Sequence, residues 1–262
     1  MTLPLPPEFL AYPLAHRGLH DREVGIIENT IAAVRAAVTA GYGIEIDVQL
    51  ASDGAAMVFH DDVLNRLTGE SGPIRGWASR DLSKLRLTGS SETVPTLPEV
   101  LEIIAGRVPV LIELKDQSGG TGAAPDDLER AVALALNDYS GPAAVMSFNP
   151  HMVASLAKRA PQIPRGITTD GYAETEWPDL SSDTLHILRE ISAFDAVGAS
   201  FISHNWRDLR APRVADLKKR GVPILCWTVK SPEDEVQARR VADNITFEGY
   251  AAHGAKSPPV RV

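Results

Sequence analysis

Short apolar runs alternate with helix-length amphipathic segments along most of the chain. Short apolar runs between turn residues are typical of buried strands, and apolar residues that recur every three to four positions are typical of surface helices. Eight such strand–helix units predict an α/β fold, a closed (β/α)8 or TIM barrel. The predicted strands end near His16, Asp47, Leu114, Ser147, Ile167, Ser203, Thr228 and Phe247, and the predicted helices include 30–40, 127–136, 211–220 and 232–241.

A hairpin is predicted after the second strand, where Asp53-Gly54 separates two apolar runs. Asp-Gly favours a two-residue turn, because both central positions of that turn need a positive φ. A two-residue turn places Asp47 opposite His60, and Glu45 lies on the same side of the sheet because side chains alternate along a strand. The predicted pairing therefore brings these three polar side chains to one surface.

The interval between the second and third predicted barrel strands is unusually long. Asp47 and Glu113 are 66 residues apart, more than twice the interval between the later strands. Beyond the hairpin, the excess falls at about 62–95, with a short helix predicted over 79–85. Long insertions in barrel folds usually shape the active site. We therefore expect a small cap over the barrel mouth, within a single domain that spans 1–262.

The composition narrows the possible functions. The chain has 262 residues, a net charge of −8 and a sequence pI near 5.4. An acidic balance argues against nucleic acid or an anionic membrane as a partner, so local charge rather than the overall charge would have to bind any phosphate substrate. No stretch approaches the length of a membrane span, and residues 1–13 lack the basic start of a secretory signal. We therefore expect a cytoplasmic protein. The single cysteine, Cys226, cannot form an internal disulfide, which agrees with that compartment but does not exclude others.

Three carboxylates stand within or at the end of predicted strands: Glu45, Asp47 and Glu113. Charged residues are rarely buried unless they are paired or bind a metal. Pairing with Arg17 and Lys115 is the structural interpretation, but three acids against two cations still repel one another. A divalent cation relieves that repulsion. Oxygen donors suit Mg²⁺ or Ca²⁺, and one cysteine excludes a thiolate zinc or iron–sulfur centre.

Two of the seven histidines differ from the others in position. His16 and His60 each end a predicted strand and belong to the cluster of polar residues, so they are candidate acid–base groups. His204 ends the sixth predicted strand and is a minor candidate for the rim of the site. Trp227 has two interpretations, as plain barrel core or as an apolar wall beside the ligand.

The order of short motifs along the chain resembles the glycerophosphodiester phosphodiesterase family. The motifs are HRG, ENT, EIDV, VFHD, IELK, SF and CWTV, and they extend from about residue 16 to 247. An HRG or an HD alone is weak evidence, but two histidines that bracket an ExD, followed by an ExK, form a specific ordered set. Two positions depart from the family pattern. Ile27 stands where the family often has proline, and 245–249 reads ITFEG where many members carry a Thr-Asp-Tyr-Pro-like ending.

The resemblance implies metal-dependent hydrolysis of glycerophosphodiesters to glycerol 3-phosphate and an alcohol. It further implies proton transfer by two histidines, a divalent metal (Mg²⁺ or Ca²⁺) on three acids, and a cationic and aromatic substrate pocket. The implied roles are His16 as base, His60 as proton donor, Glu45, Asp47 and Glu113 as metal ligands, and Arg17, Lys115 and Trp227 as substrate-binding residues.

Two alternatives remain open. One is a phospholipase D-like lyase similar to the spider-venom sphingomyelinases D, although those enzymes are secreted with disulfides and act at membranes. The other is a catalytically silent glycerophosphodiester-binding protein, although every expected catalytic position is filled here. Helix capping is the simpler interpretation of Glu28 and Asn29. The sequence leaves the role of Asp61, the leaving alcohol, the native metal, the oligomeric state and a cyclic phosphate intermediate open.

Overall fold

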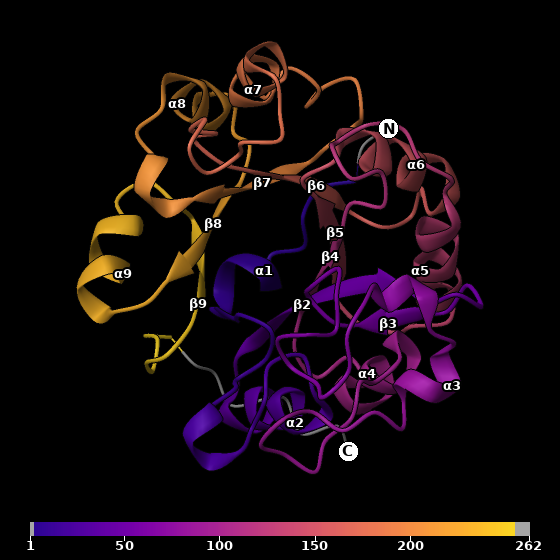
Figure 1. The fold of residues 1–262 in the computed structure, drawn as a ribbon. Helices are drawn as coiled ribbons and strands as arrows, with labels where there is room; N and C mark the ends of the chain where they lie inside the picture. The colour runs from indigo at the N-terminus through magenta and orange to yellow at the C-terminus, as the bar shows by residue number, and fades with distance from the viewer. Residues whose placement is uncertain (1–2, 255–262) are drawn as a thin grey trace.

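The computed structural model describes residues 3–254 (Figure 1). Within that range eight parallel strands close into a barrel, because β1 pairs with both β2 and β9. The predicted (β/α)8 barrel is confirmed, and each predicted strand end lies within three residues of the observed one. The barrel strands are β1 (Leu14–Ala15), β2 (Gly43–Leu50), β4 (Val110–Leu114), β5 (Ala143–Ser147), β6 (Arg165–Thr169), β7 (Phe201–Asn205), β8 (Ile224–Val229) and β9 (Asn244–Phe247).

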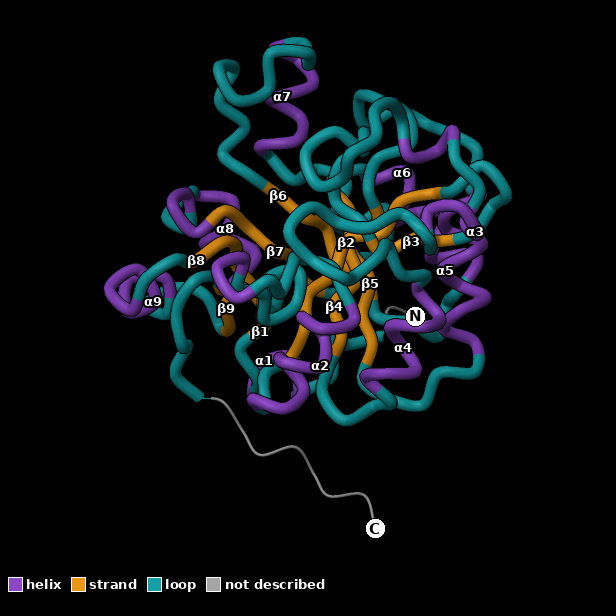
Figure 2. Tube along the Cα trace, turned by 60° about the horizontal axis from the view of Figure 1, so that its bottom comes forward, coloured by secondary structure: helices purple, strands orange, loops and turns teal. Residues whose placement is uncertain are grey.

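Helices surround the strands, as Figure 2 shows with helices in purple around a centre of orange strands. Thr30 accepts the N–H of Ala33 and so caps α2 (Ile31–Ala40), and a capping box starts α4 (Leu97–Ile104). No helix in residues 3–254 is long and apolar enough to cross a membrane. The other helices are α1 (Glu8–Ala11), α3 (Ser79–Leu82), α5 (Asp127–Asn137), α6 (Pro150–Arg159), α7 (Ser182–Arg189), α8 (Pro212–Lys219) and α9 (Pro232–Ala238), with 3-10 turns η1 (Arg22–Val24), η2 (Ile74–Gly76) and η3 (Trp206–Asp208).

Strand β2 shows how the barrel separates apolar from charged side chains. Ile44 and Val48 belong to the core between the strands and the helices, whereas Glu45 and Asp47 alternate with them and face the barrel axis. The parallel register places Asp47 next to Glu113 of β4. The three predicted metal ligands therefore project from two neighbouring strands into the barrel.

An apolar plug closes the opposite end of the barrel. Phe9 of α1 is fully buried in a cluster with Leu14 and Leu225, near the starts of their strands. The Asn244 side chain in β9 donates hydrogen bonds to the carbonyls of Phe9 and Tyr12, at 2.7 and 2.6 Å. Because this end is filled with apolar side chains, the cavity lined by charged residues lies at the carboxyl ends of the strands.

The hairpin after β2 differs from the predicted one. β3 (Ala56–Val58) pairs with β2 through a three-residue loop, 52–54, in which Gly54 has a φ of +85°. A three-residue loop with its last residue in the left-handed region is a common hairpin alternative to the two-residue turn. The predicted pairing of Asp47 with His60 is therefore wrong by one residue, and the Asp47 carbonyl accepts the N–H of Phe59 at 3.0 Å. His60 lies beyond the end of β3, so strand alternation does not control its direction.

The segment 62–95 packs around a small apolar core of its own. Leu64, Ile74, Leu82 and Val94 are buried there together with residues of the hairpin. The helix predicted over 79–85 is shorter, because α3 ends at Leu82. Most apolar side chains of the segment are therefore used in holding it against the hairpin.

Candidate active site

The predicted site residues line one cavity of about 110 Å³ at the carboxyl ends of the barrel strands. They come from 16–60, 113–115 and 227, and barrel closure brings them together. Met146, Phe148, Thr228 and Thr246 complete the lining. The predicted residues in this lining are His16, Arg17, Glu45, Asp47, His60, Glu113, Lys115 and Trp227.

Glu45, Asp47 and Glu113 converge in this cavity. Each offers a carboxylate oxygen, and these atoms lie within 4.8 Å of one another. Burial raises the pKa of Glu45 well above its usual value, and the charges of Asp47 and Glu113 raise this pKa further. The donor set fits a divalent cation such as Mg²⁺ or Ca²⁺. All three donors are carboxylates, and a cation would offset the repulsion that opposes ionisation of Glu45.

Two basic side chains partly neutralise the acids. The Lys115 ammonium lies 2.8 Å from Asp47 Oδ1 and 2.6 Å from Glu113 Oε1. Arg17 Nε lies 3.3 Å from Asp47 Oδ2, and the Arg17 backbone N–H donates to Glu45 Oε2 at 3.1 Å. The ion pairs that the sequence offered as a structural interpretation are thus present. Two cations cannot compensate three ionised acids, which agrees with the raised pKa of Glu45.

His60 is held from its Nδ1 side by a chain of charged groups. Its Nδ1 lies 2.7 Å from Asp61 Oδ1, Arg66 Nε donates to Asp61 Oδ2 at 2.6 Å, and Arg66 also binds Glu28. Burial lowers the pKa of His60 to about 4, and the charge of Lys115 contributes to the shift. The ring is therefore neutral at pH 7 in the free protein. Arg66 was not among the predicted residues, because nothing in its local sequence marks it.

Glu28 and Asn29 do not cap the helix that follows them. Thr30 does so, and Asn29 instead donates from its side chain to Asp47 Oδ2 at 2.9 Å. The Asn29 carbonyl oxygen of the same side chain accepts the Asp47 N–H at 3.2 Å. Glu28 accepts from Arg17 Nη1 at 2.6 Å. The helix-capping interpretation of both residues is wrong, and each one orients a charged side chain of the cavity. The ENT motif was the only sequence signal for this role.

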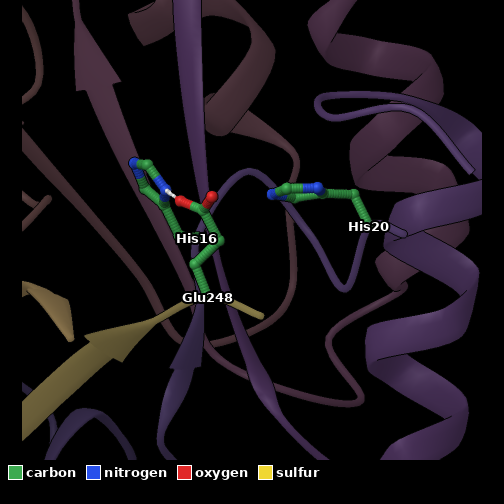
Figure 3. Close-up of side chains that lie close together, drawn as sticks. All are labelled: His16, His20 and Glu248. Atoms are coloured by element: carbon green, nitrogen blue, oxygen red, sulfur yellow. Dashed lines mark hydrogen bonds and ion pairs between the residues drawn. The ribbon is translucent and has the colours of Figure 1, made fainter. Parts of the chain in front are cut away.

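His16 is also held at its Nδ1 atom by a carboxylate. Its partner is Glu248, whose Oε2 lies 2.7 Å away (Figure 3). Burial lowers the pKa of His16, although the hydrogen bond with Glu248 opposes the shift. Glu248 lies in the segment that departs from the family pattern and was not among the predicted site residues.

Comparison with known proteins assigns the family. The model of the glycerophosphoryl diester phosphodiesterase family matches residues 16–245. The chain belongs to this family. A glycerophosphodiester phosphodiesterase of Caldanaerobacter subterraneus subsp. tengcongensis is 29% identical over 230 residues, which cover 84% of this chain and 86% of the relative.

Solved structures of phosphodiesterases share the fold. A phosphodiesterase of Oleispira antarctica, in complex with its product sn-glycerol-3-phosphate, has a TM-score of 0.74 at 23% identity and covers 92% of this chain and 94% of its own. A glycerophosphodiester phosphodiesterase of Agrobacterium tumefaciens has a TM-score of 0.68 at 25% identity and covers 90% and 95%. The predicted family, barrel and enzyme class, a phosphodiester hydrolase, are confirmed.

A second, larger cavity adjoins the first in this phosphodiesterase. Its volume is about 720 Å³, and it shares His60, Glu113, Lys115 and Phe148 with the smaller cavity. Phe148 packs between two tryptophans, with ring centroids 5.4 Å from Trp177 and 5.5 Å from Trp227. The aromatic side chains therefore form a continuous wall from one cavity to the other. Residues 61–63, 116, 119–121 and 176–180 line the outer part.

His204 is not part of the rim. Its side chain is buried, with Nδ1 2.7 Å from Thr169 Oγ1 and Nε2 3.2 Å from Asp208 Oδ2. Both ring nitrogens are engaged within the protein, and His204 lines neither of the two cavities described above. The minor prediction that His204 lies at the rim is wrong. The contacts of His204 instead join β6 and β7 to the turn that follows β7.

Proposed function

We propose that this phosphodiesterase hydrolyses glycerophosphodiesters to glycerol 3-phosphate and an alcohol, with two histidines as the proton-transfer groups. One observation carries the proposal. His16 and His60 line the same small cavity, and each is bound at Nδ1 by its own carboxylate, Glu248 or Asp61. A carboxylate at Nδ1 leaves Nε2 as the ring atom for proton transfer, as in other acid–base histidines.

The phosphodiester group would bind between the histidines and the buried charges. Glu45, Asp47 and Glu113 would hold a divalent cation, either Mg²⁺ or Ca²⁺, and their geometry and charge balance support this assignment. Such a cation polarises the phosphoryl group and so makes phosphorus more electrophilic. Arg17 and Lys115 lie within the same lining and would offset the charge of the phosphate oxygens.

Proton transfer divides between the two imidazoles. By the family resemblance, His16 accepts the proton of the attacking hydroxyl, which belongs to water or to the glycerol group of the substrate. His60 then donates a proton to the leaving alcohol. Because the pKa of His60 is about 4 in the free protein, the ring must take up this proton from solvent as substrate binds, and an anionic phosphodiester beside the ring favours that charged form. In a route through a cyclic phosphate, the two roles would exchange between steps.

The larger cavity would receive the alcohol. Trp227 lines the smaller cavity and would contact the glycerol group, whereas Trp177 lines the larger one. The predicted cap, 62–95, reaches this cavity through Asp62 and Val63. We therefore propose that these first residues of the cap, together with the loop around Trp177, select the alcohol.

The overall charge supports a small-molecule substrate rather than a nucleic acid, because the net charge is −8. A cytoplasmic location stays a prediction from the sequence.

The test of the proposed function is turnover of a substrate panel. The purified protein is incubated with glycerophosphocholine, glycerophosphoethanolamine and glycerophosphoinositol, and glycerol 3-phosphate is detected with a coupled dehydrogenase. We expect product with added Mg²⁺ or Ca²⁺ and loss of activity with EDTA. Phosphorus NMR of the products distinguishes hydrolysis from a lyase reaction, which would stop at a cyclic phosphate. Absence of turnover on the whole panel would favour a binding protein.

The role of the cap is tested with matched valine variants. Val63 lies at the larger cavity and Val236 on α9, and both side chains are exposed. Val63→Trp should lower kcat/KM for glycerophosphoinositol more than for glycerophosphoethanolamine, because a bulky side chain occupies space that the larger alcohol needs. Val236→Trp should keep the parent ranking. If both variants kept the parent order of kcat/KM values among the glycerophosphodiesters, we would conclude that 62–95 stabilises the fold and does not select the alcohol.

A further inference from the structure

A second cluster of titratable side chains lies beside the cavity and contains His16, His20 and Glu248 (Figure 3). It forms where the first and last barrel strands meet. His16 follows β1, and its backbone N–H donates to the carbonyl of Phe247 at 2.9 Å. The next residue, Glu248, donates its backbone N–H to the carbonyl of Val229 at 2.9 Å. The backbone on both sides of the His16–Glu248 contact is therefore anchored in the barrel.

The contact determines which nitrogen of His16 carries a proton. The Glu248 side chain accepts at Oε2, 2.7 Å from His16 Nδ1, and its Oε1 lies 3.4 Å from the ammonium of Lys230. The hydrogen bond with His16 lowers the pKa of Glu248 to about 2, so the carboxylate is ionised at neutral pH. An ionised carboxylate only accepts hydrogen bonds. Nδ1 of His16 must therefore be the donor, and in the neutral ring Nε2 holds the lone pair.

We propose that Glu248 is the positioning residue for His16. Glu248 holds the imidazole of His16 in the Nδ1–H form and so leaves Nε2 as the atom that transfers the proton. The proposal rests on the proposed function, in which His16 is the base. A base needs the lone pair on the atom that meets the substrate, and an imidazole without a partner at Nδ1 distributes its proton between both nitrogens. Glu248 would therefore fix the proton of the His16 ring on Nδ1 before the substrate binds.

The arrangement gives each histidine its own carboxylate. Asp61 follows His60 directly in the sequence, whereas Glu248 is 232 residues from His16. His20 faces the same region, but its Nε2 has no hydrogen-bond partner within the described residues. Of the two histidines near Glu248, only His16 forms a hydrogen bond of 2.7 Å with it and also lines the cavity. The carboxylate therefore acts on His16.

The first test reads the tautomer directly and needs no turnover. Nitrogen-15 NMR of the imidazole rings distinguishes Nδ1–H from Nε2–H, and a sample of His16→Gln assigns the His16 signals. In the parent protein, at a pH where the His16 ring is neutral, we expect the Nδ1–H form. In Glu248→Ala we expect signals averaged between the two forms. An Nε2–H ring in the parent would overturn the proposal, whatever the fate of the variants.

The second test compares kcat with KM on a glycerophosphodiester that the parent turns over. Partners that orient metal-binding histidines typically contribute about 10- to 100-fold, and we expect at least the same range for a histidine that transfers a proton. We expect Glu248→Ala to lower kcat by about that factor with KM within about threefold, and Glu248→Asp to restore part of the loss. Glu233→Gln, an exposed glutamate on α9, serves as the matched control and should keep parent kinetics.

The outcomes separate this proposal from the proposed function. If the parent turns over no glycerophosphodiester, the proposed function fails, and the NMR result still decides the tautomer. If the parent is active and folded Glu248→Ala keeps kcat within about twofold, the positioning role is wrong. A rise in KM without a fall in kcat would also contradict it, because a positioning residue for the base acts on the chemical step.

Discussion

Glu45→Gln tests the three-carboxylate site without relying on turnover. Glu45 is the acid with the least compensation. Both basic side chains lie next to Asp47, and among residues 3–254 Glu45 accepts only the Arg17 backbone N–H. Burial and the neighbouring carboxylates already raise the pKa of Glu45. Glutamine keeps the size of the side chain and removes its charge. Without metal, the variant should therefore unfold at the same temperature as the parent or higher.

Added metal should reverse this difference in Tm, because it stabilises the parent more than the Glu45→Gln variant. A ligand at 100 times its dissociation constant stabilises the folded state by about 2.7 kcal/mol. For a protein of roughly this size, about 2 to 4 °C of Tm corresponds to each kcal/mol. The parent should therefore gain roughly 5 to 10 °C with saturating Mg²⁺ or Ca²⁺. Glu45→Gln should gain less than half of that, because one of three anionic ligands is lost.

The assay is thermal unfolding at pH 8 in EDTA and in a metal titration, followed by circular dichroism. The matched control is Glu129→Gln, another buried glutamate that lies on α5 and outside the cavity. The control should keep the full metal response. Two results would refute the reasoning: a parent Tm that does not respond to either metal, or a Glu45→Gln variant with the full response.

Two further predictions concern the histidines and a buried acid. His16→Ala and His60→Ala should each lower kcat at least about a hundredfold with an unchanged fold, and the double variant should lose less than the product of both factors. Near-parent kcat in either single variant would remove that histidine from the chemistry. Glu129 is buried with Oε2 unpartnered, and burial raises its pKa to about 7, helped by the charge of Asp126. Because the folded state holds this proton more tightly, the contribution of Glu129 to stability should fall as pH rises from about 4.5 to 7. Denaturant unfolding at pH 8 should then show Glu129→Gln more stable by about 1 to 3 kcal/mol, with little difference at pH 4. An equal difference at both pH values would contradict this.

The strands and most of the candidate site could be predicted because their signals are local or nearly so. Alternation in β2 places Glu45 and Asp47 on one side of the strand, and the ExK spacing does the same for Glu113 and Lys115. The hairpin register could not be predicted in the same way. Asp-Gly is compatible with loops of two or three residues, and the local sequence does not distinguish them; in the structure the three-residue loop accompanies packing of the hairpin against 62–95.

The sequence by itself determined the barrel, the family and the residues that carry charge into the cavity. Each of these follows from periodicity along one element or from the order of short motifs. Only the tertiary structure decided which groups orient those residues. Glu248 reaches His16 because barrel closure brings β9 against β1, and Asn29 binds Asp47 while Thr30 caps the helix. Such contacts join residues that are distant along the chain or whose local interpretation is different, so they form only when the backbone has closed around them.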